Sequence, residues 1–197
     1  MLKIGLTGGI GSGKSIIAKV FEQLGIPVFN SDAEAKKLIN SDPKISTVIK
    51  ENFGKNSYGI DGQLDRKRLA EIVFNDEEAL HKLNSIVHPA VQLEFLSWLN
   101  KHKQAPYILK EAAIIFESGS NKGLDKVIAI SAPELLRIQR TVKRDNSSPQ
   151  SVKKRIEKQM SEDEKLKRSD FIIYNDEMQL VLPQVLKLHE LFAARKE

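Results

Sequence analysis

The chain has 197 residues, of which 41% are hydrophobic and 29% charged, proportions typical of a folded globular protein rather than a disordered one. It contains no cysteine, which excludes disulfides, thiolate catalysis and thiolate metal sites and permits a reducing compartment. The net charge of +5 is concentrated between Arg137 and Arg168, where eleven Lys or Arg stand against five Asp or Glu. Aromatic residues are only 6% and do not interleave with basic ones, so nucleic-acid binding is not favoured.

The opening stretch, MLKIGLTGG, carries no basic leader followed by an apolar segment. No run approaches the roughly 18 apolar residues that a membrane span needs. We therefore expect a cytoplasmic protein with no membrane partner. The length is enough for one sizeable core with residues left for insertions.

Short apolar runs rich in β-branched residues alternate with helical segments along the chain. Such alternation is typical of a parallel sheet covered by helices on both faces. The sequence therefore predicts an α/β fold with a five-stranded parallel sheet, whose strands span 2–7, 26–30, 106–111, 125–131 and 170–175.

Some 75 residues separate the second and third strands, far too many for a simple crossover. Their pattern predicts a helical insertion. Asp42 and Pro43 are expected to open one helix that ends near Gly54. Further helices are expected over 65–74, over 75–88 and from Pro89 onward.

A second helical insertion, basic in character, is expected from about 133 to 168. Its first helix carries Arg137, Arg140 and Arg144 at positions i, i+3 and i+7, which places them on one face opposite Leu135. Three guanidiniums on one face suit a lid that closes over polyphosphate, and they equally suit a solvated helix face. A second helix is expected to begin at Pro149, capped by Ser148.

The stretch GGIGSGKS follows the first strand and precedes a helix, as the pattern G-x-x-x-x-G-K-[ST] of a phosphate-binding loop requires. Backbone N–H groups of such a loop surround the β-phosphate at the helix N-terminus. Lys14 would reach the β- and γ-phosphates, and the Ser15 hydroxyl would bind Mg²⁺. The nucleotide-binding residues expected here are Gly8, Gly9, Gly11, Ser12, Gly13, Lys14, Ser15 and Ile16.

Two other nucleotide-binding classes match less well. A dinucleotide loop, G-x-G-x-x-G, would need glycine where Lys14 stands, although Asp32 lies about as far along as its ribose-binding acid would. NKGLD at 121–125 resembles the guanine-reading motif of a GTPase switch, but it has one residue too many and precedes its strand. A kinase for a small molecule is the interpretation that remains.

Asp32 follows the second strand, and ligands of open α/β sheets bind at the carboxyl ends of the strands. There it could accept the proton of an acceptor hydroxyl. The surrounding SDAE at 31–34 is also a capping-box pattern, in which Asp32 would only stabilise a helix start. Spacing alone leaves both interpretations open.

Taken in order, these motifs resemble the dephospho-CoA kinases, which transfer the γ-phosphoryl group of ATP to the 3′-hydroxyl of dephospho-CoA in the last step of coenzyme A synthesis. The resemblance covers nearly the whole chain. It implies a P-loop kinase of the nucleoside-monophosphate-kinase type with ATP and dephospho-CoA as substrates, Mg²⁺, and no obligate protein partner. Another small-molecule kinase of this architecture is the alternative. The matching stretches are LTGGIGSGKS, GIPVFNSDAEAKKL, LNSIVHPAV, RTVKRD, RIEKQM and SDFIIYND.

The resemblance also implies roles for single residues and segments. Asp32, Lys14 and Arg140 would be catalytic, and Arg144 and Asn175 would contact ATP. Residues 1–32, 105–132 and 169–197 would form the nucleotide-binding core, 33–104 the acceptor lobe and 133–168 the lid. The acceptor would be held by Asp32, Asn84, His88, Glu117 and Arg155.

The chain departs from the family pattern at two places. The family usually has Asp-Ala-Asp where this chain has Asn30, Ser31 and Asp32, so only the second acid is kept. After the third strand, the family's acid-x-Pro-Leu-Leu-Phe-Glu becomes EAAIIFE, which loses the proline and keeps Glu111 and Glu117.

Overall fold

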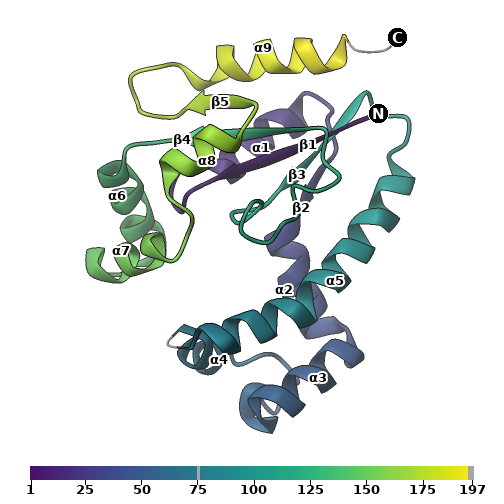
Figure 1. Ribbon diagram of the computed structural model, residues 1–197, viewed down its shortest axis with the longest axis vertical. Coiled ribbons are helices and arrows are strands. Elements are labelled where there is room, and N and C mark those ends of the chain that lie inside the picture. Colours follow the sequence, from purple (N-terminus) through teal and green to yellow (C-terminus); the bar gives the residue numbers. More distant parts are fainter. Residues whose placement is uncertain (75, 195–197) are drawn as a thin grey trace. The chain divides into compact units, whose positions relative to one another are not determined.

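The computed structural model describes residues 1–74 and 76–194 (Figure 1). The chain divides into two compact units. Unit 1 comprises Met1–Asn30 and His102–Glu197, and unit 2 is the continuous segment Ser31–Lys101. The segment expected to form a lid, 133–168, belongs to unit 1. The last three residues of the expected core segment 169–197 lie outside the described residues.

Unit 1 is built on a sheet of five parallel strands, as the sequence predicts. They are β1 (Leu2–Gly8), β2 (Val28–Asn30), β3 (Tyr107–Glu111), β4 (Lys126–Ser131) and β5 (Phe171–Tyr174). Their order is β2-β3-β1-β4-β5, and every neighbouring pair is parallel. The carboxyl ends of all strands therefore lie along one edge of the sheet, where ligands of such folds bind.

The core of unit 1 lies between the sheet and two of its helices. Ile4 and Leu6 of β1 pack with Phe21 of α1 and Phe192 of α9. Gly5 points to the opposite face, where its missing side chain leaves room for side chains from the β3–β4 connection. The helices that the structure describes in this unit are α1 (Lys14–Gln23), α6 (Glu134–Asp145), α7 (Pro149–Glu157), α8 (Glu162–Arg168) and α9 (Val181–Ala193).

Helices α6, α7 and α8 form the basic insertion. The α7 start agrees with the sequence: Ser148 accepts a hydrogen bond from the Ser151 N–H at 3.2 Å, and Pro149 is the first helical residue. Helix α6 packs against α7, and α8 packs against β4 (Figure 1). This insertion is thereby attached to the sheet through β4.

Unit 2 is helical and has a small core of its own. Ile45, Ile49 and Tyr58 are buried together, and the Tyr58 hydroxyl donates to the Ile39 carbonyl at 2.8 Å. Asp42 caps α3 through the Lys44 N–H, as its place before Pro43 predicts. The elements are α2 (Ser31–Ser41), α3 (Pro43–Phe53), the 3-10 turn η1 (Lys55–Ser57), α4 (Arg66–Phe74) and α5 (Glu77–Lys101).

The expected helix start at Pro89 is wrong, because α5 continues through that proline as a single helix. Proline removes one intrahelical hydrogen bond at a cost of roughly 3 kcal/mol, so packing must offset that loss. Val87, Val91 and Phe95 supply it, because they form one buried stripe at four-residue spacing across the proline. The other expected start, at position 75, lies outside the described residues.

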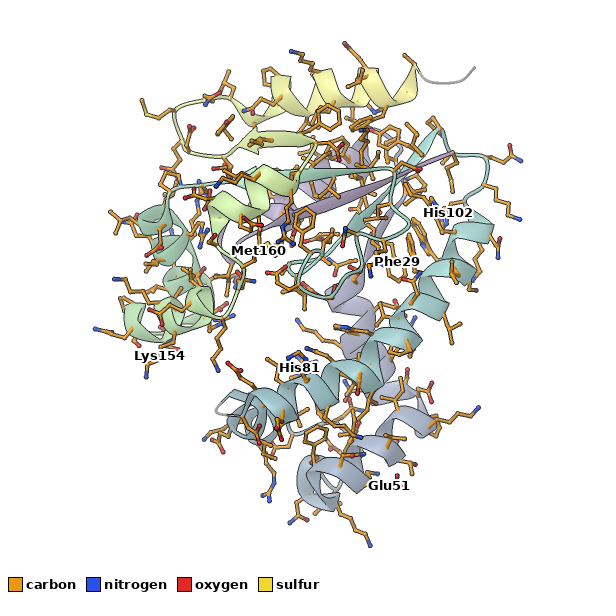
Figure 2. All side chains as sticks on the ribbon, viewed as in Figure 1. Phe29, Glu51, His81, His102, Lys154 and Met160 are labelled. Carbon is orange, nitrogen blue, oxygen red and sulfur yellow. The ribbon has the colours of Figure 1, made fainter. Side chains whose placement is uncertain are left out.

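Buried side chains occupy the interior of each unit, among them Phe29 of β2 at 4% exposure (Figure 2). None of the helices within residues 1–74 and 76–194 is both long and apolar enough to cross a membrane.

Candidate active site

The loop between β1 and α1 has the backbone that a phosphate-binding loop needs. Gly11 and Gly13 have φ angles of 78° and 98°, in the left-handed region where a side chain is strained. A Cβ atom at Gly11 would also clash with the Arg137 carbonyl oxygen. Gly13, the N-cap residue of α1, has no side chain to cap the helix, so the positive end of this helix faces the loop.

Three side chains hold the peptide groups of this loop. The Lys14 ammonium donates to the Gly8 carbonyl at 2.8 Å and to the Gly9 carbonyl at 3.2 Å. The Asn175 amide, just after β5, donates to the Ser12 carbonyl at 2.8 Å. The Ile10 N–H donates to the Gln159 side chain at 2.9 Å. Two predicted ATP ligands, Lys14 and Asn175, thus lie together at the loop, and Gln159 joins them.

Glu111, at the end of β3, brings the loop serine and the β2 strand together. Its Oε1 accepts from the Ser15 hydroxyl at 2.9 Å, and its Oε2 accepts from the Asn30 amide at 2.6 Å. Glu111 as a whole is only 4% exposed. A second carboxylate at position 30 could not donate this hydrogen bond, which gives a physical account of Asn30 where the family pattern has Asp.

A serine hydroxyl beside a buried carboxylate is an oxygen donor set of the kind that Mg²⁺ prefers. The residues present therefore fit the ion that the loop motif implies. Glu111 was identified from the sequence only as a retained acid, and its position at the end of the strand beside β1 is the signal that could have assigned it. No group of three or more His, Asp or Glu within the described residues forms a ready metal site.

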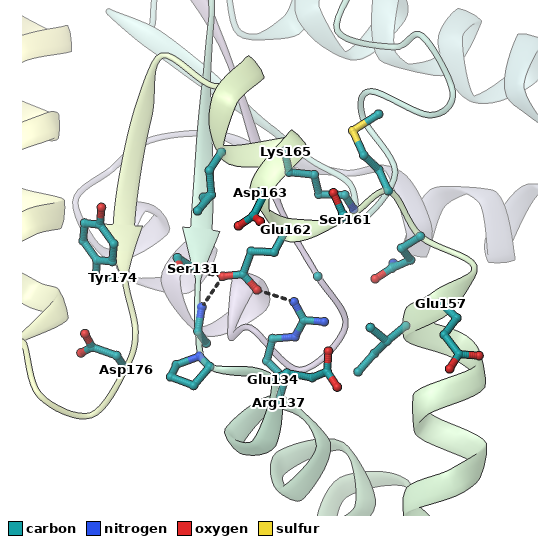
Figure 3. A pocket seen from close by; sticks show the side chains of 17 residues that line it. Ser131, Glu134, Arg137, Glu157, Ser161, Glu162, Asp163, Lys165, Tyr174 and Asp176 are labelled. Carbon is teal, nitrogen blue, oxygen red and sulfur yellow. Dashed lines mark hydrogen bonds and ion pairs between the residues drawn. The ribbon is translucent and has the colours of Figure 1, made fainter.

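The three arginines of α6 do not share one environment, so the prediction of a single cationic face is wrong in part. Arg137 is 4% exposed, whereas Leu135, expected on the apolar face, is 75% exposed. The Arg137 guanidinium pairs with Glu162 of α8, whose other oxygen accepts from the Ser131 hydroxyl at 2.6 Å (Figure 3). The helix turns its first arginine inward because a carboxylate and the Gly9 backbone lie there.

Arg140 and Arg144 are more exposed and have different partners. Arg140 donates to the Asn175 carbonyl and to Glu177, both at 3.1 Å. Arg144 donates to Asp145 at 2.7 Å, and the same carboxylate accepts from Arg155 at 2.8 Å. These hydrogen bonds, first from Arg144 and then from Arg155, hold the pKa of Asp145 well below its usual value.

Glu117 lies beside a lysine that the sequence did not single out. Its carboxylate pairs with Lys165 of α8 at 2.9 Å and accepts from the Met160 N–H at 3.0 Å. Lys165 is 2% exposed and also donates to the Ala113 carbonyl at 3.0 Å. In the sequence, Lys165 and Glu162 belong to the charge run SEDEKLKR, which is typical of a solvated face and gives no signal of burial.

A cavity of about 660 Å³ in unit 1 adjoins these residues (Figure 3). Gly9 of the loop, Ser131 at the end of β4, Arg137 of α6 and Lys165 of α8 all line it. The phosphate-binding loop and the basic insertion therefore share one hollow in this unit.

The dephospho-CoA kinase (CoaE) family model matches residues 2–180 of the chain. A dephospho-CoA kinase of Bacteroides fragilis is 39% identical over 188 residues, which cover 95% of this chain and 91% of the relative. The chain belongs to the dephospho-CoA kinase family. Its activity is that of the family, a kinase reaction in the final step of coenzyme A biosynthesis.

Solved structures agree with this membership. A protein from Thermus thermophilus has a TM-score of 0.84 and 31% identity, covering 100% of this chain and 98% of its own. A dephospho-CoA kinase from Campylobacter jejuni has a TM-score of 0.69 and 29% identity, covering 98% of both chains. The P-loop kinase fold expected from the sequence is confirmed.

The remaining residues that the family motifs imply lie in unit 2. Asp32 is exposed in the first turn of α2, and Asn84 and His88 are half-buried one turn apart on α5. The capping-box interpretation, in which Ser31 precedes the helix and caps it, is wrong because Ser31 is already the first residue of α2. The Ser31 hydroxyl is buried and has no hydrogen-bond partner in the part of the chain that the structure describes. Asp32 is nevertheless a first-turn acid.

Proposed function

We propose that this kinase transfers the γ-phosphoryl group of ATP to the 3′-hydroxyl of dephospho-CoA, with the ATP phosphates held by the loop Gly8–Ser15. The observation that carries the proposal is the loop itself. Gly11 and Gly13 adopt left-handed backbone, Lys14 folds back over the loop, and the loop ends at the N-terminus of α1. Because the donor is ATP, we expect the reaction in the cytoplasm.

Within this proposal, Lys14 and the α1 N-terminus stabilise the negative charge on the β- and γ-phosphates. Ser15 and Glu111 would hold Mg²⁺, which when bound shields the charge of those phosphates. The buried Glu111 also fixes Ser15 by accepting its hydroxyl hydrogen, so the serine oxygen keeps one orientation toward the loop.

Arg140 and Arg144 supply the cations that balance the charge on the group in transfer. Both have carboxylate partners, Glu177 and Asp145, with partly exposed side chains. Exposed pairs are worth about 0.2–1 kcal/mol, so a phosphate can replace either carboxylate at little cost. The segment 133–168 is accordingly the proposed lid.

For the acceptor, we assign proton removal to Asp32 and binding to the helical segment 33–104. Asn84 and His88 present polar groups on one side of α5, because they are four residues apart. Arg155, beside Asp145, is the proposed contact for an acceptor phosphate.

An acceptor screen tests the proposal. Purified protein is incubated with ATP, Mg²⁺ and dephospho-CoA, AMP, CMP, shikimate or gluconate, and ADP formation is measured. We expect dephospho-CoA to support turnover far above the others. Preference for AMP would contradict the acceptor assignment and leave the kinase fold untouched.

The same assay tests Asp32. Asn has the shape of Asp and is tolerated at helix starts, but it does not accept a proton at neutral pH. Asp32→Asn should therefore lower kcat by roughly 100-fold or more, with little change in the KM for ATP and in stability. Glu34→Gln, in the same turn of α2, is the matched control. More than half of the wild-type kcat in Asp32→Asn would rule out the base.

A further inference from the structure

We propose that Gln159 is a positioning residue that orients the phosphate-binding loop and, through it, Lys14. We further propose that Glu117 and Lys165 hold Gln159 in place. The inference rests on the proposed function, because it takes Gly8–Ser15 as the ATP site.

One peptide group connects Gln159 to Lys14. The N–H of the Gly9–Ile10 peptide donates to Gln159 Oε1 at 2.9 Å. The carbonyl of the same peptide accepts from Lys14 Nζ at 3.2 Å and from the Ser12 N–H at 3.1 Å. A rotation of this peptide would remove the Lys14 contact together with the Gln159 contact.

The local chain has little stiffness to prevent such a rotation. Ile10 lies between Gly9 and Gly11, and glycine gives the backbone more freedom than any other residue. The Gln159 side chain restrains this peptide from a segment 149 residues away. Because Gln159 is neutral, it makes the contact without placing a negative charge beside the expected phosphates.

The backbone of Gln159 is itself restrained on both sides. Its N–H donates to the Ile156 carbonyl at 2.9 Å, at the end of α7. The next N–H, that of Met160 (Figure 2), donates to Glu117 at 3.0 Å. Glu117 is fixed by Lys165, whose 2% exposure leaves it little room to move.

This chain of contacts gives Glu117 a role different from the acceptor contact that the family motif implies. Its carboxylate acts on the loop through Met160 and Gln159, so its loss should lower kcat/KM for ATP. A carboxylate that contacts the acceptor would instead change the KM for dephospho-CoA.

The test uses Gln159→Met, which keeps the length of the side chain and removes the acceptor oxygen. We expect kcat/KM for ATP to fall about three- to tenfold, the range of one hydrogen bond, with an unchanged KM for dephospho-CoA. Hydrogen exchange at the Ile10 amide should accelerate in the ligand-free protein. Gln150→Met, on the exposed side of α7, is the matched control. Wild-type kcat/KM for ATP in Gln159→Met would overturn the inference.

A double-mutant cycle tests the link to Glu117. Glu117→Gln should lower kcat/KM for ATP in the wild-type background and have little further effect in Gln159→Met. Additive losses, or a raised KM for dephospho-CoA, would overturn the link. If Glu117→Gln fails to fold because Lys165 is left unpaired, Glu117→Gln with Lys165→Met replaces it in the cycle.

A different result would contradict the proposed ATP site. Lys14→Ala with wild-type kinetics would show that the loop is not the ATP site. An impaired Lys14→Ala beside an unimpaired Gln159→Met would leave the site standing and overturn the role of Gln159 alone.

Discussion

The phosphate-binding loop and helix α6 both bring positive charge to unit 1, but they are built differently. In the loop, Lys14 bonds carbonyl oxygens five and six residues away. In α6, Arg137 and Arg140 pair with carboxylates 25 and 37 residues away. A short motif therefore describes the loop and its lysine contacts, although Gln159 and Asn175 also bind its peptides from distant segments. The arrangement of Arg137 and Arg140 depends on what the rest of the fold places beside them.

The arginines of α6 also differ among themselves. The Arg137 and Glu162 side chains are 5% and 26% exposed, while those of Arg140 and Glu177 are 27% and 65% exposed. Breaking a buried pair leaves an unpaired charge, but exposed pairs exchange partners easily. We infer that Arg137 supports the fold and that Arg140 is available to a ligand.

The largest effect is expected from Lys14→Ala, which removes the ammonium of the loop. Its charge acts on the transferring phosphoryl group, so kcat should fall about 1,000-fold. The circular dichroism spectrum should be retained, because Lys14 is not part of the apolar core. Lys19→Ala, on the exposed side of α1, controls for loss of a positive charge. Equal losses of kcat in Lys14→Ala and Lys19→Ala would contradict a specific role for the loop lysine.

Smaller effects are expected when Arg137 and Arg140 are each replaced by Met, on stability for Arg137 and on kcat for Arg140. Arg137→Met leaves Glu162 partly buried without its cation, so the free energy of unfolding should fall by about 2–4 kcal/mol in urea titrations. Arg140→Met should change stability by less than about 1 kcal/mol and lower kcat roughly 10- to 100-fold. Equal losses of stability in the two variants would contradict the distinction between Arg137, which supports the fold, and Arg140, which is available to a ligand.

Features whose signals lie within a few residues could be predicted from the sequence. The five strands, the phosphate-binding loop, the Asp42 cap of α3 and the Ser148 cap of α7 are of this kind. In each, the residues that give the signal are neighbours in the chain, so spacing is enough to identify the feature.

Features that depend on distant partners could not be predicted in this way. Pro89 indicates a helix start by its own chemistry, and only the buried stripe of α5 explains why the helix continues. Glu162 and Lys165 have the sequence pattern of a solvated surface. The partial burial of Glu162 and the full burial of Lys165 follow from their partners Arg137 and Glu117, 25 and 48 residues earlier. Asp32 could be placed in a first turn, and its catalytic role stays a prediction.

The smallest effect, and a pH-dependent one, is expected at Asp145, which holds Arg144 and Arg155 on α6 and α7. Their hydrogen bonds lower its pKa in the folded protein below the ordinary value of 3.8. A carboxylate with a lowered folded pKa stabilises the fold above its unfolded pKa and loses that contribution as pH falls toward the folded pKa. Asp145→Asn should thus lower the free energy of unfolding at pH 7 by less than about 1 kcal/mol, since the pairs are partly exposed.

The difference between wild type and Asp145→Asn should narrow below about pH 4, where the unfolded carboxyl becomes protonated first. Urea titrations at pH 7 and pH 3 measure it, with Asp61→Asn in unit 2 as a control for the change in net charge. Added salt should narrow the difference at pH 7 as well, because partly exposed charges are screened. A difference that stays constant with pH and salt would mean that Asp145 holds the two arginines by shape rather than by charge. In that event the arginines of α6 would resemble the loop more closely, with their positions fixed by hydrogen-bond geometry that a phosphate could not easily displace.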